Sequence, residues 1–192
     1  MKTKIETIRK RRQREGKTDY KKRIKILLSG KPRLVVRKSL RNITAQIVIF
    51  EEKGDRVLVG IRSDALADYG WKGSFKNLPS AYLLGALVAK KAKEQKISHA
   101  ILDIGLNKSV PGCKFFAVLK GAIDNGIDIP HSKDVLPSDE RVSGKHIQDF
   151  AKKLSGDEQE YSKRFGEYRK NDADPAKIED LFKSVKSKII GA

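Results

Sequence analysis

Basic side chains are concentrated at the start of this chain, where they could neutralise a polyanion. The first 41 of its 192 residues hold 17 Lys and Arg against 3 Asp and Glu, a surplus of 14 within a formal net charge of +18. Positive charge this concentrated repels itself unless a partner neutralises it. A nucleic acid is the first candidate partner, and an anionic membrane surface is the second.

The candidate binding residues fall in four segments. Lys and Arg neutralise phosphates, hydroxyl and amide groups donate to a nucleic-acid backbone, and an aromatic ring can stack on an exposed base. The candidates are Arg9, Lys10, Arg11, Arg12, Arg14, Lys17, Lys21, Lys22 and Arg23 in an N-terminal arm; Arg33, Arg37, Lys38, Ser39, Arg41 and Asn42 around a predicted hairpin; Trp71, Lys72 and Lys76 in a glycine-rich aromatic loop; and Asn107 and Lys108 in the loop of residues 105–112.

Two of these segments also have a purely structural interpretation. Trp71 is the only tryptophan, and either it or Tyr69 could fold back over the sheet while the other ring stacks on a base or ribose. Residues 105–112 match neither a dinucleotide-binding fingerprint nor a P-loop. Asn107 and Lys108 could therefore contact phosphates or simply form a connection.

Clustered carboxylates would indicate a different chemistry, the metal-dependent cleavage of RNA. The candidate metal ligands are Asp64, Asp103, and Asp139 or Glu140. The first predicted strand carries basic residues where a nuclease of the ribonuclease H-like class places its leading carboxylate. Such a nuclease is kept as the alternative function.

Cysteine and histidine offer little for catalysis or metal binding. Cys113 is the only cysteine, so no intrachain disulfide can form and a cysteine-based zinc site would lack ligands. His99, His131 and His146 fall on different predicted elements. We expect no catalytic site, no metal, no cofactor and no small-molecule substrate.

A membrane association is the weakest of the three interpretations. The start is basic, like the first part of a secretory signal, but no apolar core of the required length follows it. The longest nearly apolar run, residues 81–89, is far shorter than the roughly 20 residues that span a bilayer. We expect a soluble, cytoplasmic protein that binds no membrane.

The N-terminal arm is predicted to end in a helix. Thr18 is the expected N-cap of a helix that continues through Leu28, and a glycine and a proline follow it closely. Tyr20, Ile24, Leu27 and Leu28 fall on one side of this helix. We expect that stripe to dock on the core while the lysines point outward.

Three strands are then predicted at residues 33–39, 43–51 and 56–63, joined by short polar turns. Such short connections favour an antiparallel meander. The apolar positions expected on one face of the third strand are Val57, Val59 and Ile61.

The second half of the core alternates helix and strand. Asn77 is the expected N-cap of a helix over residues 78–96, in which Gly85 would permit a close approach to the sheet. A continuous apolar strand of the buried, parallel kind follows at residues 100–104, and a second helix at residues 113–125.

The order β-β-β-α-β-α predicts an α/β fold with an open mixed sheet and ribonuclease H-like topology. We expect a basic N-terminal arm and helix over residues 1–32, an α/β RNA-binding core domain over residues 33–131, and a helical C-terminal extension over residues 132–192. We expect the extension to be an appendage of two or three helices.

The chain resembles the universal L eighteen family of large-subunit ribosomal proteins, in particular its archaeal and eukaryotic branch. The pieces that carry the resemblance are Glu15-Gly16-Lys17-Thr18-Asp19-Tyr20 with Lys22-Arg23, residues 29–39, Ala45-Gln46-Ile47, Gly70-Trp71-Lys72, the helix of residues 81–92, Ile101-Leu102-Asp103, residues 122–130, Leu136-Pro137 and Gly144-Lys145-His146-Ile147. This sequence departs from the family's pattern in the loop after Asp103 and in the tail beyond Ser155.

The resemblance implies a structural role in translation. A member of this family would bind 5S rRNA through its arm, first hairpin and adjoining loops, and help attach that RNA to the large-subunit rRNA at the central protuberance. The implied partners are 5S rRNA, the large-subunit rRNA and a neighbouring 5S-binding ribosomal protein.

Overall fold

A four-stranded mixed sheet forms the centre of the molecule. The computed structural model describes residues 8–191. The strands are β1 (Arg33–Lys38), β2 (Ile43–Glu51), β3 (Gly54–Arg62) and β4 (Ile101–Asp103). They lie in the order β3-β2-β1-β4, with β1 antiparallel to β2 and parallel to β4. The predicted meander and the predicted parallel strand are both confirmed.

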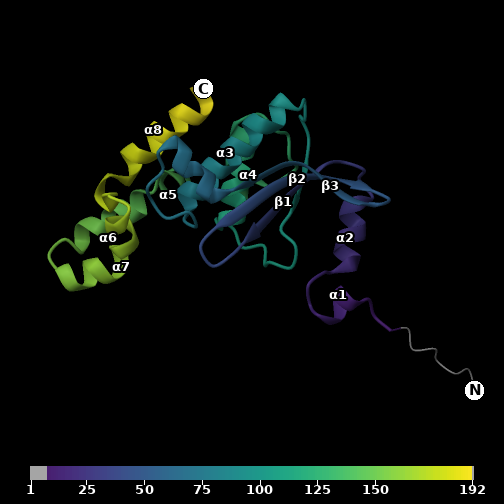
Figure 1. The fold of residues 1–192 in the computed structure, drawn as a ribbon, viewed down its shortest axis with the longest axis horizontal. Coiled ribbons are helices and arrows are strands. Elements are labelled where there is room, and N and C mark those ends of the chain that lie inside the picture. The colour runs from purple at the N-terminus through teal and green to yellow at the C-terminus, as the bar shows by residue number, and fades with distance from the viewer. Residues whose placement is uncertain (1–7, 192) are drawn as a thin grey trace, which may run out of the picture.

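Helices occupy both ends of the molecule (Figure 1). Figure 1 shows α1 and α2 at the end nearest the N-terminus and α5 to α8 at the opposite end. The helices are α1 (Arg11–Arg14), α2 (Tyr20–Leu27), η1 (Ser63–Tyr69), α3 (Leu78–Glu94), α4 (Lys114–Asp124), η2 (Lys133–Val135), α5 (Asp139–Ser143), α6 (Lys145–Lys153), α7 (Glu158–Lys170), η3 (Pro175–Lys177) and α8 (Ile178–Gly191).

A bulge in β3 changes which of its side chains face the core. The pairing with β2 shifts between Ile47 and Val48, which oppose Val59 and Val57 and leave Leu58 as the extra residue. Val59 is buried, whereas Val57 is 48% exposed. The prediction that Val57 shares the buried face with Val59 is therefore wrong, and Leu58 packs partly against the core instead.

Helices α3 and α4 pack against each other through two glycines. A Cβ on Gly85 would lie 2.1 Å from the carbonyl oxygen of Val118, and a Cβ on Gly121 would lie 2.1 Å from that of Tyr82. Gly85 thus permits a close approach to α4, not to the sheet as expected. The predicted N-cap is confirmed, because the side chain of Asn77 accepts from the backbone N–H of Ser80 at 2.8 Å.

Helix α2 differs from its prediction at both its cap and its buried face. The cap is Asp19, whose carboxylate accepts from the two backbone N–H groups of Lys21 and Lys22, while Thr18 accepts from Arg12 instead. No residue of α2 is buried, and Ile24 is 56% exposed. The expected apolar docking is wrong because polar contacts hold this helix. Residues 1–7 of the arm lie outside the described residues.

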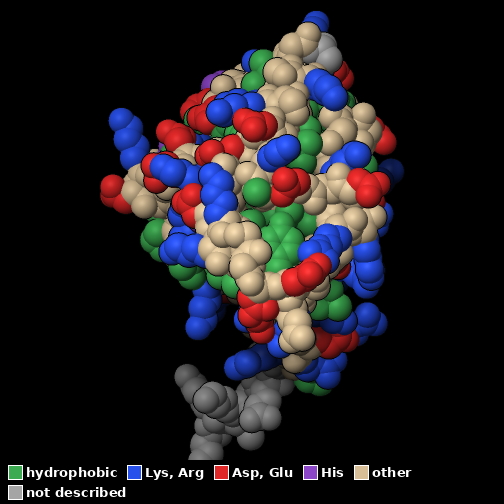
Figure 2. All heavy atoms as spheres, turned by 90° about the vertical axis from the view of Figure 1, so that its left-hand side faces the viewer, with side chains coloured by type: hydrophobic (Ala, Val, Ile, Leu, Met, Phe, Trp, Pro, Cys, Tyr) green, Lys and Arg blue, Asp and Glu red, His purple; other side chains and the backbone are tan. Residues whose placement is uncertain are grey.

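The C-terminal helices join the main core. Helix α8 packs against α3, and its Phe182 ring lies 5.6 Å from the ring of Tyr82 in α3. Apolar residues of α5 to α8 belong to the same buried cluster as those of the sheet. Figure 2 shows the end of the molecule that these helices form, where acidic and basic side chains are intermixed around exposed hydrophobic ones. The tail thus has four α-helices, more than the two or three expected, of which α5 and α8 pack on α3.

The architecture is a mixed α/β fold. The apolar residues of β1, β2 and β3 form one hydrophobic core with α3 and α4. This core supports β1, which carries the basic residues Arg33, Arg37 and Lys38.

Candidate nucleic-acid interface

A cluster of ion pairs fastens the basic end of the molecule to the sheet. The guanidinium of Arg23 in α2 donates two hydrogen bonds to the carboxylate of Asp55 in β3, at 2.9 and 3.0 Å. Asp55 also forms an ion pair with Arg33 of β1 at 2.8 Å. On the other side of α2, the ammonium of Lys22 donates to the carbonyl of Gly105 at 3.1 Å. Helix α2 is therefore tied to both edges of the sheet.

Asp103 at the end of β4 is the second centre of this cluster. Arg33 and Arg37 donate to its two carboxylate oxygens at 3.1 and 3.0 Å, and Arg37 also donates to its carbonyl at 2.7 Å. The backbone N–H of Gly105 donates to the same carboxylate at 2.8 Å. Burial alone would raise the pKa of Asp103, but the charge of Arg37, this backbone hydrogen bond and Arg33 together lower it below the ordinary value.

The pKa of Asp55 is lowered in the same way. Partial burial opposes ionisation, while the guanidinium groups of Arg33 and Arg23 favour the charged carboxylate and outweigh it. Both carboxylates are thus ionised at neutral pH and hold their arginines in place.

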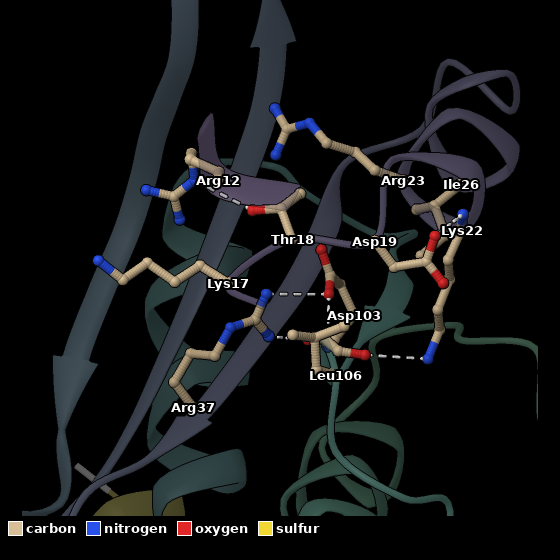
Figure 3. Close-up of a pocket in the computed structure, with 11 residues that line it drawn as sticks. Arg12, Lys17, Thr18, Asp19, Lys22, Arg23, Ile26, Arg37, Asp103 and Leu106 are labelled. Carbon is tan, nitrogen blue, oxygen red and sulfur yellow. Dashed lines mark hydrogen bonds and ion pairs between the residues drawn. The ribbon is translucent and has the colours of Figure 1, made fainter. Parts of the chain in front are cut away.

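A small hollow of about 130 Å³ opens between α2, β1 and the loop after β4. Figure 3 shows Arg37 beside Asp103, with Lys22 reaching the loop that follows β4. Five basic residues line the hollow: Arg12, Lys17, Lys22, Arg23 and Arg37. Its two acidic residues are already engaged, because Asp19 caps α2 and Asp103 pairs with Arg33 and Arg37. The net character of the hollow is therefore cationic.

Most of the predicted cations of the arm are accessible to a partner. The exposed members are Arg9, Lys10, Arg11, Arg12, Arg14, Lys17, Lys21 and Lys22. We call these residues, with Arg23 and Arg37, the front basic face. Arg23 and Arg37 are partly committed to carboxylates of the sheet, and Arg11 and Lys17 form exposed ion pairs with Glu15 at 3.1 and 2.8 Å. The rest of this face consists of exposed cations of α1, α2 and the turns around them.

Two predicted binding residues are buried. Trp71 is 1% exposed and donates through Nε1 to the carbonyl of Ser74 at 3.2 Å. The prediction that Trp71 stacks on an RNA base is therefore wrong. The alternative interpretation, in which the ring folds back onto the core, is confirmed. Arg33 is 2% exposed and is enclosed by Asp55 and Asp103. It positions other groups and cannot reach a phosphate.

The loop residues are ordered by local hydrogen bonds. The hydroxyl of Ser39 accepts from the N–H of Asn42 at 3.0 Å and donates to its carbonyl at 3.1 Å. Lys76 donates to the carbonyl of Leu40 at 3.0 Å, which joins the aromatic loop to the hairpin turn. Asn107 donates to the carbonyl of Ile104 at 2.8 Å. Lys38, Arg41, Lys72 and Lys108 are exposed, and the structure does not gather them into the front hollow.

The carboxylates that would have supported a nuclease are used otherwise. Asp103 is enclosed by two arginines, and Asp64 and Asp139 pair with Arg62 and Lys120. Across residues 8–191, no three His, Cys, Asp or Glu side chains form a group able to hold a metal ion. No helix in the same range is both long and apolar enough to cross a membrane.

Sequence reasoning missed Asp55, which anchors both Arg23 and Arg33. The residue lies in the Lys53-Gly54-Asp55 turn, where an aspartate is common for local reasons. Its role depends on the pairing of three segments that are distant in sequence. A stronger signal was available for Asp103, since the buried Arg33 on the neighbouring strand needs an acidic partner.

A comparison with known protein families gives independent information about this chain. Residues 6–98 and 91–132 match the model of the family described as ribosomal large subunit proteins 60S L5, and 50S L18. The matched segments include α2, the whole sheet and both core helices. The chain therefore belongs to this family of large-subunit ribosomal proteins.

Proposed function

We propose that this chain binds 5S rRNA through the front basic face and helps attach that RNA to the large-subunit rRNA at the central protuberance. Membership of the ribosomal family supports a structural role with rRNA and ribosomal-protein partners. The finer assignment to 5S rRNA rests on the resemblance of the arm and first hairpin to the 5S-binding branch of that family.

The observation that carries the proposal is the fastening of α2 to the sheet. Arg23 and Lys22 fix the helix at two points, so the cations of α1 and α2 lie on a supported surface. A supported row of cations can follow one RNA backbone, because less side-chain and chain freedom is lost on binding. The base sequence would then be read elsewhere or by shape.

The remaining assignments are proposals of the same kind. The proposed phosphate ligands, in addition to the front basic face, are Lys38, Ser39, Arg41, Asn42, Lys72, Lys76, Asn107 and Lys108. A neighbouring 5S-binding ribosomal protein is the proposed protein partner, in cytoplasmic ribosomes. The sheet is proposed to follow the ribonuclease H-like order, with a division at residues 32 and 131 into arm, core and tail.

A charge-removal experiment tests the proposal. The variant R9Q/R11Q/R12Q/R14Q removes four exposed cations of the front basic face, and K153Q/K170Q/K177Q/K183Q removes four exposed lysines of the tail as a matched control. Each phosphate contact contributes about 0.7 to 0.9 to the slope of log affinity against log salt. Filter binding to 5S rRNA should show a slope reduced by about 3 in the arm variant only. Equal slopes in the two variants would exclude the front basic face as the 5S-binding surface.

A further inference from the structure

Strand β1 sends its basic residues to both faces of the sheet. Side chains alternate along a strand, so Arg33 and Arg37 share one face while Leu34, Val36 and Lys38 share the other. Arg37 lies on the face of the front hollow. Leu34 and Val36 are fully buried in the core, and the ammonium of Lys38 lies 5.7 Å from the ring centre of Phe115 in α4. Lys38 therefore belongs to the side of the molecule that α4 covers.

On that side, Lys38 meets three further cations around a second hollow. The hollow measures about 380 Å³ and is lined by Lys38, Lys76, Lys114 and Arg141 over an apolar floor that includes Phe115. Its lining contains no carboxylate among the residues that the structure describes. We call these four basic residues the lysine hollow. It contains no residue of the front basic face.

Within residues 8–191, no ion pair with a carboxylate balances the charges of the lysine hollow. Lys114 is half-buried, and both its burial and the nearby charges of Lys76 and Lys38 lower its pKa. The two acidic residues that precede Arg141, Asp139 and Glu140, pair with other lysines at 2.6 and 2.8 Å. Lys76 donates to one backbone carbonyl. An anion bound here would relieve the repulsion that the free protein bears.

An aromatic groove continues from the lysine hollow and shares two of its lysines. The groove measures about 500 Å³, and Lys76, Lys114, Phe150, Phe165 and Tyr168 are among its lining residues. Phe150 is 44% exposed, although it is a large apolar side chain. Cations beside an accessible aromatic ring are the combination that binds unpaired nucleotides, with phosphates on the lysines and a base on the ring.

We propose that the lysine hollow and its aromatic groove form a second RNA-binding site, which holds backbone phosphates of an unpaired rRNA segment and packs one of its bases against Phe150. The site lies on the opposite face of the sheet from the front basic face, so the chain can engage two RNA segments at once. The proposal rests on the proposed ribosomal function. The RNA segment can come from 5S rRNA or from the large-subunit rRNA, and the experiment separates these sources.

The test uses the full chain with each of two purified probes, 5S rRNA and large-subunit rRNA. The variant K38Q/K114Q removes two cations of the lysine hollow, and K153Q/K183Q is the control with the same change in net charge at exposed lysines of α6 and α8. The salt slope of binding should fall by about 1.4 to 1.8 for one probe in the first variant only. Phe150→Ala should lower the affinity for the same probe by about fivefold or more and leave the salt slope unchanged, because stacking is not ionic.

The outcomes distinguish the two proposals. If the salt slope of K38Q/K114Q falls with 5S rRNA alone, the bound segment belongs to 5S rRNA. If the slope falls with large-subunit rRNA alone, the segment belongs to the large-subunit rRNA. Unchanged slopes with both probes overturn the lysine hollow as an RNA site, even where the arm variant R9Q/R11Q/R12Q/R14Q still loses 5S binding and the proposed function stands. Circular dichroism of each variant confirms that a lost contact, not a lost fold, is measured.

Discussion

The ion cluster around Asp103 makes a sharp prediction about stability. Replacing Asp103 by Asn keeps the shape of the side chain and an acceptor for the backbone N–H of Gly105, but removes the charge. Arg33, which is 2% exposed, then keeps only Asp55 as an ionic partner. Arg37 loses its carboxylate but stays partly in water, with 45% of its side chain exposed.

The expected loss of stability follows from these two arginines. Removing one partner of a buried ion pair costs about 3 to 5 kcal/mol, because a charge remains buried without compensation. Asp55 compensates Arg33 in part, so the lower end of that range applies. Arg37 adds about 0.2 to 1 kcal/mol, the value of a solvent-exposed pair. The free energy of unfolding should therefore fall by about 3 kcal/mol.

Urea unfolding followed by circular dichroism measures this loss. With a slope of about 2 kcal/mol per molar, the midpoint should fall by about 1.5 M. Asp128→Asn is the matched control, because Asp128 pairs with His99 at the surface and is 74% exposed, and it should change stability by less than about 0.5 kcal/mol. The variant R33M/D103N should be less destabilised than the sum of its single changes. A midpoint for Asp103→Asn equal to that of the control would refute the structural role of this cluster.

Three further predictions follow from the same contacts. The pKa of Asp103 is lower in the folded than in the unfolded chain, so the stability it contributes is fully present above about pH 4 and is lost as the pH falls through the folded pKa. Urea midpoints measured from pH 7 to 2.5 should show this loss of stability, and the loss should be smaller in Asp103→Asn. Gly85→Ala should cost at least about 3 kcal/mol, because its Cβ would lie 2.1 Å from the backbone oxygen of Val118; Gly156→Ala, which meets nothing within 4 Å, should stay within about 1 kcal/mol of the parent in the same assay. The emission of Trp71, which is 1% exposed, should shift to the red on unfolding but change little when 5S rRNA binds; strong quenching by RNA would show that the ring reaches a base after all.

Elements with local signals were predictable from the sequence. The helix cap at Asn77, the tight turns of the meander and the apolar run that becomes β4 depend on residues within a few positions of each other. The separation of charge was equally visible, because it needs only a count along the chain. Fold class and the basic end of the molecule follow from such short-range information.

The errors share a dependence on distant residues. Trp71 stands in a loop that reads as exposed, but a Cβ on Gly73 would touch both its ring and that of Tyr168, which shows how closely α7 covers this loop. Helix α2 has an apolar stripe, but Asp55 and Gly105 hold it from segments that its own sequence does not reveal. The packing of the tail on the core was not visible either, because nothing in the sequence around Phe182 indicates its partner Tyr82 in α3.

The register of β1 against β4 is what keeps two cationic surfaces apart. Asp103 is paired with Val35, so Arg33 and Arg37 flank it on the same face, two residues to either side. A slip of β4 by one residue would turn Asp103 toward the apolar core face and leave both arginines without their carboxylate, whereas a slip of β1 would exchange the faces of Arg37 and Lys38 and leave Asp103 without Arg37. We infer that the ion cluster contributes specificity of register as well as stability, a use of buried charge known from other folds. The buried Leu34 and Val36 define the core face of β1, and the pairing of Arg33 and Arg37 with Asp103 defines the other face, so the two features together place Arg37 and Lys38 on opposite faces of the sheet.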